Sequence, residues 1–321
     1  MSQREPPLLR LVGELTQLTA HLNRLREAPV VSDEEASDIA RLQAQAEGLR
    51  AELGQAFGRA SAWERVQLAR HEQRPYTLDY VEAFVGQFTE LHGDRAYGDD
   101  GAVVAGLGWV RGHRVAVIGH QKGRTARERR ERNFGMPRPE GFRKAVRVMR
   151  LADKFGCPVL SFVDTPGADC LEEAESRGIS EAIAVSQRTM FELGVPIVVV
   201  VIGEGGSGGA IGIGIGDRVL MLQHAYYSVI TPEACAAILW RSEERAAEMA
   251  TALCLTAEEA LRLGAVDTVI EEPPLGAHSD PLETARRIEE AVVGALEELG
   301  GRGPGELRQS RYEKFRRMGC R

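Results

Sequence analysis

The sequence predicts an α/β protein that begins with an antiparallel pair of helices. From Val103 onward, short runs rich in valine and isoleucine alternate with segments of helical length. Strands that are separated by helices favour a largely parallel sheet, which is the α/β class. Before residue 64 there is no such alternation, and leucines instead recur at helical spacing.

The N-terminal segment has two apolar seams. Leucines step by three and four along residues 8–25, and apolar residues repeat this stepping along residues 39–53. Pro29 interrupts the pattern, and Ser32 or Asp33 can cap a second helix. We therefore expect a helical hairpin that serves as a packing or dimerisation arm.

The rest of the chain divides into strands and helices in the following order. We expect strands at 102–110, 113–121, 158–164, 196–202, 218–223, 226–230 and, after a stop at Gly264, 265–270. We expect helices at 143–156, 180–194, 232–240, 256–263 and, as the last one, 284–299. "GGRGPGE" then reads as a flexible link to a basic tail. The expected domains are the hairpin, 1–64, and a domain with a C-terminal helical tail, 65–321.

Composition excludes several classes of protein. The 321 residues are 43% hydrophobic and 27% charged, which is ordinary for a globular chain with a large core. The formal net charge of −7 argues against broad nucleic-acid binding. No apolar run has the length of a membrane span, and the N-terminus has no signal segment. The five cysteines form no C-x-x-C pair, so we expect a cytoplasmic protein without a metal site.

The stretch "GEGGSGGAIGIGIGD", residues 203–217, carries the strongest local signal, because eight of its fifteen residues are glycine. It fits G-x-G-x-x-G, but the next strand ends in "LMLQHA" without the acid that a dinucleotide fold needs. It also fits the G-x-S-x-G of a serine hydrolase. Ser207 would then act with Asp267 and His278, but no HGGG-type segment precedes it, so this is a minor alternative.

A third pattern, "DTPG" at 164–167, resembles the D-x-x-G of nucleotide hydrolases. The chain contains no Gly-Lys dipeptide and hence no phosphate loop, which excludes nucleotide hydrolysis.

The glycines are better explained as part of an anion-holding turn. Two strands, ending at Val163 and Ile202, each run into a turn of small residues before a helix. Free N–H groups at a helix N-terminus carry partial positive charge and stabilise an enolate or other oxyanion. We assign close approach of a ligand to Gly205, Gly206, Gly208 and Gly209, and helix–strand packing to Gly212, Gly214 and Gly216.

A basic segment precedes the glycines. Five arginines lie between Arg124 and Arg132, with Glu128 and Glu131 among them. They form either a solvated helix face or a surface that steers a phosphorylated or carboxylated substrate. The following "NFGMPRPEGF" is a shaped loop, for which binding and purely structural roles remain equally open.

Several long motifs resemble one family. "GDRAYGDD", "GHQKGR", "RRERNFGMPRPEGFRKA", "DTPGA", "RGISEAIA", "VIGEGGSGGAIGIGIGD" and "YSVITPEACAAILW" are similar to the alpha subunits of bacterial acetyl-CoA carboxylase carboxyltransferase, over about residues 65–275. The resemblance implies a crotonase-type ββα superhelix. It implies transfer of a carboxyl group from carboxybiotin, on a separate biotin carboxyl carrier protein, to acetyl-CoA. The product is malonyl-CoA, for fatty acid biosynthesis.

The resemblance also implies partners and site residues. The active site would form with a beta subunit, in an alpha2beta2 heterotetramer, and that subunit would supply the enolate hole and a zinc ribbon. In this chain, Gly208 and Gly209 would hold the ureido oxygen of carboxybiotin. The substrate-binding residues would be Gly205, Gly206, Gly167, Ala168, Lys122 and Arg124.

One segment departs from the family pattern. After "DTPGA" the family usually continues Tyr-Pro-Gly-Val-Gly, whereas this chain has Asp169, Cys170, Leu171, Glu172 and Glu173. Carboxylates near the biotin site would repel carboxybiotin and weaken activity, unless the loop faces solvent, where screening makes their cost small. The alternatives are therefore an inactive or regulatory paralogue and an enzyme that acts on another acyl-CoA without biotin.

Overall fold

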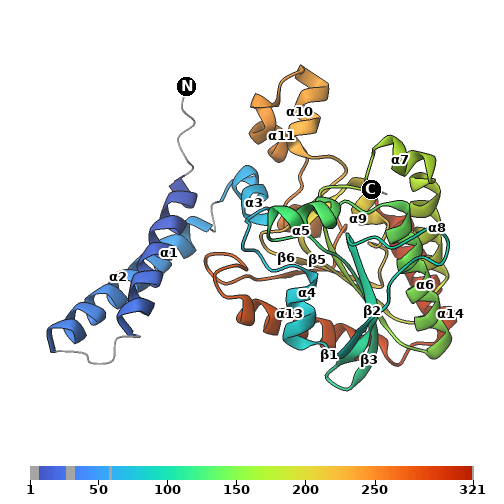
Figure 1. Cartoon of the computed structure of the whole chain (residues 1–321), viewed down its shortest axis with the longest axis horizontal. Helices are drawn as coiled ribbons and strands as arrows, with labels where there is room; N and C mark the ends of the chain where they lie inside the picture. Colours follow the sequence, from blue (N-terminus) through green and yellow to red (C-terminus); the bar gives the residue numbers. More distant parts are fainter. Residues whose placement is uncertain (1–6, 27–32, 58–59, 320–321) are drawn as a thin grey trace.

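The computed structural model describes residues 7–26, 33–57 and 60–319. The first two ranges form α1 (Pro7–Arg26) and α2 (Asp33–Phe57), and the segment with Pro29 and Ser32 lies outside the described residues. The two helices pack along their apolar seams and extend away from the α/β body (Figure 1). The buried cluster between them also includes two residues of that body, and its members are Leu15, Leu22, Ala46, Leu53, Leu68 and Leu275.

An eight-stranded sheet forms the centre of the body. Its order is β1-β2-β3-β4-β5-β6-β8, with β7 paired to the end of β5. β1 to β3 are antiparallel and all later pairs are parallel, as the alternation of strands and helices predicts. The strands are β1 (Gly86–Glu90), β2 (Val103–Val110), β3 (His113–His120), β4 (Val159–Thr165), β5 (Ile197–Gly206), β6 (Arg218–Leu222), β7 (Tyr226–Ser228) and β8 (Thr268–Ile270).

Helices cover both faces of the sheet. α6 (Pro139–Phe155) packs on β2 and β3, and it ends where Gly156 takes the left-handed conformation, φ 65°. α6, α8 and α14 lie on one side of the sheet, and α4 and α13 lie on the other (Figure 1). The remaining bounds are α3 (Ala62–Ala69), α4 (Thr77–Phe84), α5 (Ala126–Glu131), η1 (Asn133–Gly135), α7 (Glu172–Ser176), α8 (Ile179–Glu192), α9 (Ser207–Ile211), α10 (Pro232–Trp240), η2 (Glu243–Arg245), α11 (Ala246–Ala252), α12 (Ala257–Arg262), α13 (Pro281–Leu299) and α14 (Pro304–Arg317).

β5 runs four residues further than the sequence predicts. We expected a turn from Gly203, but the strand continues to Gly206 because β7 returns alongside it and pairs with residues 204–206. β4 likewise ends at Thr165 rather than Val163, where it pairs with Gly205. The glycine-rich turn is therefore shorter than expected, and it begins at Ser207.

The expectation that the helix at 284–299 is the last one was wrong, because a further helix follows α13. α14 follows it, and Arg311 of α14 is fully buried. Arg311 donates to both carboxylate oxygens of Asp217, at 3.0 and 2.7 Å, and to the carbonyls of Met190, Leu193 and Val195. The helix is anchored by this charged side chain more than by an apolar seam, so its sequence resembles a basic tail.

Candidate active site

The carboxyl ends of three neighbouring strands bring together a lysine and two acids. Lys122 lies two residues after β3, Asp164 lies near the end of β4, and Glu204 lies near the end of β5. The Lys122 Nζ atom is 2.7 Å from Asp164 Oδ1 and 2.8 Å from Glu204 Oε1. Ligands of open α/β sheets bind at this edge of the sheet, so these three residues, here the ionic cluster, mark a candidate site.

Burial and charge pairing set the protonation of the ionic cluster. Burial acts to lower the pKa of Lys122, but the two carboxylates outweigh it and raise that pKa above its usual range. Burial acts to raise the pKa of Glu204, but Lys122 and Arg70 outweigh it and lower that pKa to about 2. For Asp164 burial prevails over Lys122, and the pKa is raised. The cluster therefore holds a protonated lysine and an ionised Glu204 at neutral pH.

A second set of contacts ties Glu204 to α3 and α10. Its carboxylate accepts hydrogen bonds from Tyr226 Oη at 2.6 Å and from Arg70 Nε at 2.8 Å. Arg70, in the turn after α3, also pairs with Glu233 in the first turn of α10. Neither Arg70 nor Tyr226 carried a signal in the sequence, because both come from segments far from the glycines. Glu204 could have been noticed as a charged residue between two glycines of the glycine-rich stretch.

A cavity of about 260 Å³ opens beside the ionic cluster. Its lining residues include Arg70, Tyr76, Lys122, Phe134, Pro166 and Glu204. Phe134 belongs to the "NFGMPRPEGF" loop and is half exposed at the mouth. The loop therefore contributes an apolar wall to a polar cavity.

Close packing accounts for three of the glycines. A Cβ at Gly203 would overlap the Asp164 carboxylate, and one at Gly206 would overlap the Pro166 carbonyl. A Cβ at Gly205 would lie 2.6 Å from the Tyr227 ring. Gly205 and Gly206 were predicted to admit a ligand. The structure places both in β5, where the neighbouring backbone and ring already require glycine.

The two glycines after Ser207 differ from each other. A Cβ at Gly209 would lie 2.6 Å from the backbone of Gly167, so the β4 and β5 loops touch there. A Cβ at Gly208 would meet only the end of the Ile183 side chain, at 3.2 Å. The first N–H groups of α9 have no acceptor within the helix. Gly208 therefore has the open space that a ligand at this turn requires.

The serine hydrolase alternative is wrong, because its three residues do not meet. Ser207 does have a strained backbone, with φ 47°. However, His278 stacks on His71 with ring centroids 3.7 Å apart, and neither of its ring nitrogens has a hydrogen-bond partner among the described residues. Asp267 instead accepts from Lys314 and from the Val219 N–H.

Arg124 and its neighbours serve mainly internal contacts. Arg124 donates to the carbonyls of Glu72 and Arg74, at 2.8 and 3.0 Å, pairs with Asp79 and stacks on the Tyr76 ring. Arg127, Arg129 and Arg132 also have partners within the chain. These contacts favour a structural role for most of the arginine run, although Arg129 also lines the cavity at the ionic cluster.

Of the five residues that depart from the family pattern, Asp169 is buried and the other four are exposed. Asp169 is buried, and its carboxylate accepts from the Asn133 side chain and the Leu171 N–H, both at 2.9 Å. Glu172 and Glu173 begin α7, and both are exposed. The charges of Glu172 and Glu173 are therefore screened by water and salt. This is the arrangement for which we expected these carboxylates to repel carboxybiotin only weakly.

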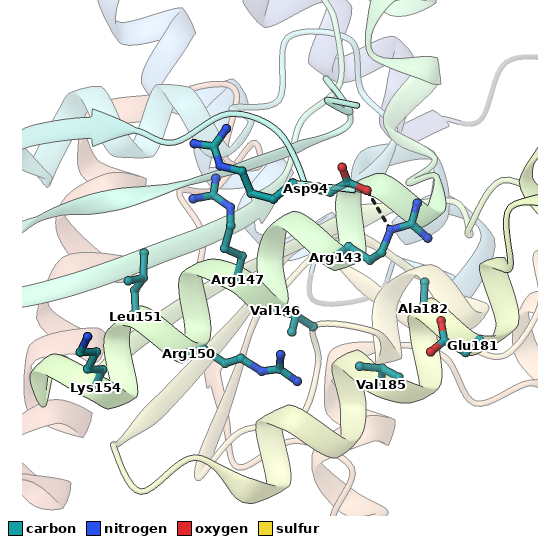
Figure 2. Close-up of a pocket in the computed structure, with 11 residues that line it drawn as sticks. Asp94, Arg143, Val146, Arg147, Arg150, Leu151, Lys154, Glu181, Ala182 and Val185 are labelled. Atoms are coloured by element: carbon teal, nitrogen blue, oxygen red, sulfur yellow. Dashed lines mark hydrogen bonds and ion pairs between the residues drawn. The ribbon is translucent and has the colours of Figure 1, made fainter. Parts of the chain in front are cut away.

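A larger cavity, of about 630 Å³, lies elsewhere, between α6 and α8 (Figure 2). It shares no lining residue with the cavity at the ionic cluster. Its rim is basic, and Arg143 pairs there with Asp94 at 2.8 Å.

Over the ranges that the structure describes, no group of three or more metal-ligating side chains gathers. No helix in those ranges has the length and apolar character to cross a bilayer.

Solved structures of acyl-CoA carboxylases and related enzymes share this fold. The 12S transcarboxylase core covers 69% of this chain with a TM-score of 0.57 and 21% identity, over 41% of its own chain. The Pseudomonas aeruginosa geranyl-CoA carboxylase beta subunit covers 77%, with a TM-score of 0.56 and 16% identity, over 46% of its own chain. At such identities the likeness shows the fold alone. It confirms the crotonase-type architecture.

Sequence relatives define the family. A family model described as acetyl co-enzyme A carboxylase carboxyltransferase-like matches residues 9–319. The acetyl-coenzyme A carboxylase carboxyl transferase subunit alpha of Acaryochloris marina is 48% identical, over 99% of this chain and 98% of its own. The protein of the same name from Bordetella pertussis is 50% identical, over 98% and 95%. The chain belongs to the family of acetyl-CoA carboxylase carboxyltransferase alpha subunits.

The ionised Glu204 makes the stability of the fold depend on pH. Its pKa is about 2 in the fold, against an ordinary value of 4.5. Its contribution is therefore complete above pH 4.5 and is lost as the pH falls towards 2, and it amounts to about 3 kcal/mol. Glu204→Gln should be less stable than the wild type at neutral pH. The difference between their free energies of unfolding should become smaller in acid. Urea unfolding at a series of pH values measures it.

Glu175→Gln, at an exposed position of α7, is the matched control, and its free energy of unfolding should equal that of the wild type at every pH. A Glu204→Gln gap that stays constant from neutral to acid pH would contradict the ionised state assigned to Glu204.

Proposed function

We propose that this chain is the alpha subunit of an acetyl-CoA carboxylase carboxyltransferase. It assists transfer of a carboxyl group from carboxybiotin, on a separate carrier protein, to acetyl-CoA, which gives malonyl-CoA for fatty acid synthesis. Identity near 50% over almost the full length to proteins of that name supports the proposal. The single observation that carries it is the open N-terminal turn of α9 beside the ionic cluster.

The site contributes an anion-holding turn. Carboxybiotin supplies a transferable carboxyl group and a ureido oxygen that gains negative charge as the group departs. The N–H groups of Gly208 and Gly209 would donate to that oxygen, and the space over Gly208 admits it. Gly167 and Ala168 line the turn from the side of β4. Lys122, held between Asp164 and Glu204, keeps the ends of the three strands in place around the turn.

The second half of the chemistry requires another protein. Formation of the acetyl-CoA enolate needs its own preorganised donors, and by family resemblance these belong to a beta subunit that also carries the zinc ribbon. We propose an alpha2beta2 assembly, in the cytoplasm, which meets the biotin carboxyl carrier protein. In support, a Pseudomonas malonate decarboxylase that shares the fold, with a TM-score of 0.56 over 74% of this chain, was solved as a hetero-tetramer with coenzyme A.

The purified chain should have no carboxyltransferase activity by itself. Malonyl-CoA should form only when the cognate beta subunit and the carboxylated carrier protein are added, because the isolated chain presents one anion-holding turn and not two. Transfer of label from carboxylated carrier to acetyl-CoA measures this. Full activity of the isolated chain would contradict the proposal, and so would a lack of product from the complete mixture.

Substitutions at Gly208 and at Ser207 should differ strongly in their effect on turnover. Gly208→Val should fold, because its Cβ meets only the tip of the Ile183 side chain, and thermal unfolding verifies this. It should nevertheless reduce turnover of the assembled enzyme by about 100-fold or more, since it fills the space of the ligand. Ser207→Ala should change turnover by less than about threefold. Steady-state rates with the same partner proteins compare the two variants. An inactive Ser207→Ala together with an active Gly208→Val would contradict this prediction and support Ser207 as a nucleophile.

A further inference from the structure

The cavity between α6 and α8, here the α6–α8 cavity, gathers basic side chains from two elements (Figure 2). Four of them recur every three or four positions and so follow one face of α6, namely Arg143, Arg147, Arg150 and Lys154. Arg95 joins them from the loop between β1 and β2. The volume of about 630 Å³ is that of a pocket for a small molecule.

Most of this positive charge is not neutralised by the chain. Arg143 pairs with Asp94, and Glu181 is the other carboxylate of the lining. The lining holds five cations and two carboxylates, although the whole chain has a net charge of −7. Four of the cations have no carboxylate partner within the described residues, and these unpaired cations are Arg95, Arg147, Arg150 and Lys154.

The lack of partners on α6 contrasts with other helices of the chain. Several exposed helical arginines pair with a glutamate one turn away, as Arg188 does with Glu192 on α8. The one glutamate of α6, Glu140, lies in its first turn, and its one aspartate, Asp153, accepts from the Gly194 N–H. Unneutralised charge that lines a concave surface favours an anionic ligand over a merely solvated helix face.

The loop between β1 and β2 holds two of the unpaired cations in place. Arg147 donates to the carbonyls of residues 92 and 93, at 3.0 and 3.1 Å. Arg95 takes a left-handed conformation, φ 65°, which is strained for a residue with a side chain. Asp94 stabilises this loop, because its Oδ1 atom accepts from the N–H groups of residues 96–98. Cations that are fixed before a ligand arrives lose less entropy on binding.

The rest of the lining is apolar. Figure 2 shows these side chains on the two facing helices, Val146 and Leu151 on α6 and Ala182 and Val185 on α8. A bare inorganic ion would leave them in contact with water, whereas a ligand with a nonpolar part would cover them. The cavity therefore combines contacts for an anion with contacts for an organic body.

We propose that the α6–α8 cavity binds a small organic diphosphate. Its phosphates would contact the unpaired cations, and its organic part would cover the four apolar residues. The guanidinium groups suit this role, because each can donate two hydrogen bonds to one phosphate. The lining has a net excess of three positive charges, which balances the about three negative charges of such a ligand at neutral pH.

The inference does not depend on the proposed function. No lining residue belongs to the ionic cluster or to the turn at Gly208. Binding can therefore be measured on the full chain without a partner protein, while formation of malonyl-CoA by the complete mixture tests the proposed function separately.

The test is calorimetric titration of the full chain with four probes. ADP and geranyl diphosphate share the diphosphate and differ in the organic part, so the tighter of the two identifies that part as a nucleoside or a hydrocarbon chain. Inorganic pyrophosphate and adenosine each offer one half of the contacts. Each should bind at least about tenfold more weakly than the better organic diphosphate.

Two matched double variants locate the site. Arg150→Ala/Lys154→Ala removes two exposed cations of the lining, and the Kd of the better organic diphosphate should rise roughly 100-fold, about tenfold for each cation. Arg262→Ala/Arg286→Ala removes the same charge from α12 and α13, and the Kd should change by less than about threefold. Thermal unfolding of both variants verifies that each is folded.

Four results would overturn the inference. Neither organic diphosphate would bind, or pyrophosphate would bind as tightly as both of them. The two double variants would weaken binding equally, which would assign the effect to net charge. The Arg150→Ala/Lys154→Ala variant would weaken binding of a cognate beta subunit and leave the Kd of the diphosphates unchanged, which would assign the cavity to a contact between proteins.

Discussion

The close approach of β4 and β5 at their carboxyl ends is the constraint on which the candidate site depends. Gly203 leaves room for the Asp164 carboxylate, Gly206 touches the Pro166 carbonyl, and Gly209 touches the backbone of Gly167. A side chain at any of these positions would separate the two strands. Lys122, which bridges both, would then lose one of its carboxylate partners. Glycine is therefore needed here mainly so that the backbones of the β4 and β5 ends can contact each other.

The sequence predicted the parts of the structure that local patterns encode. Val and Ile runs predicted β4 and β5, and Gly156 predicted the end of α6. It could not predict the pairing of Lys122 with Glu204, because 82 residues separate them and only the sheet register joins them. α14 was missed for the related reason that its buried contact is an arginine, Arg311, which in a sequence resembles a solvated charge. The extension of β5 to Gly206 depends on β7, a strand of three residues.

The structure also changes how the sequence motifs are understood. Of the glycines expected to admit a ligand, Gly208 alone combines an unobstructed approach with a place in the first turn of a helix. Glu172 and Glu173, which suggested a divergent enzyme, face solvent on α7.

The most direct test of this account compares the free energies of unfolding of Gly206→Ala and Gly208→Ala in the isolated chain. Both glycines have negative φ, so alanine adds a methyl group without backbone strain. Gly206→Ala should lose about 1–3 kcal/mol or more, because its Cβ would overlap the Pro166 carbonyl. Gly208→Ala should change stability by less than about 1 kcal/mol, since only the tip of Ile183 must yield. Equal losses of stability, or a larger loss at Gly208, would contradict the division between glycines that close packing requires and the glycine that has open space beside it.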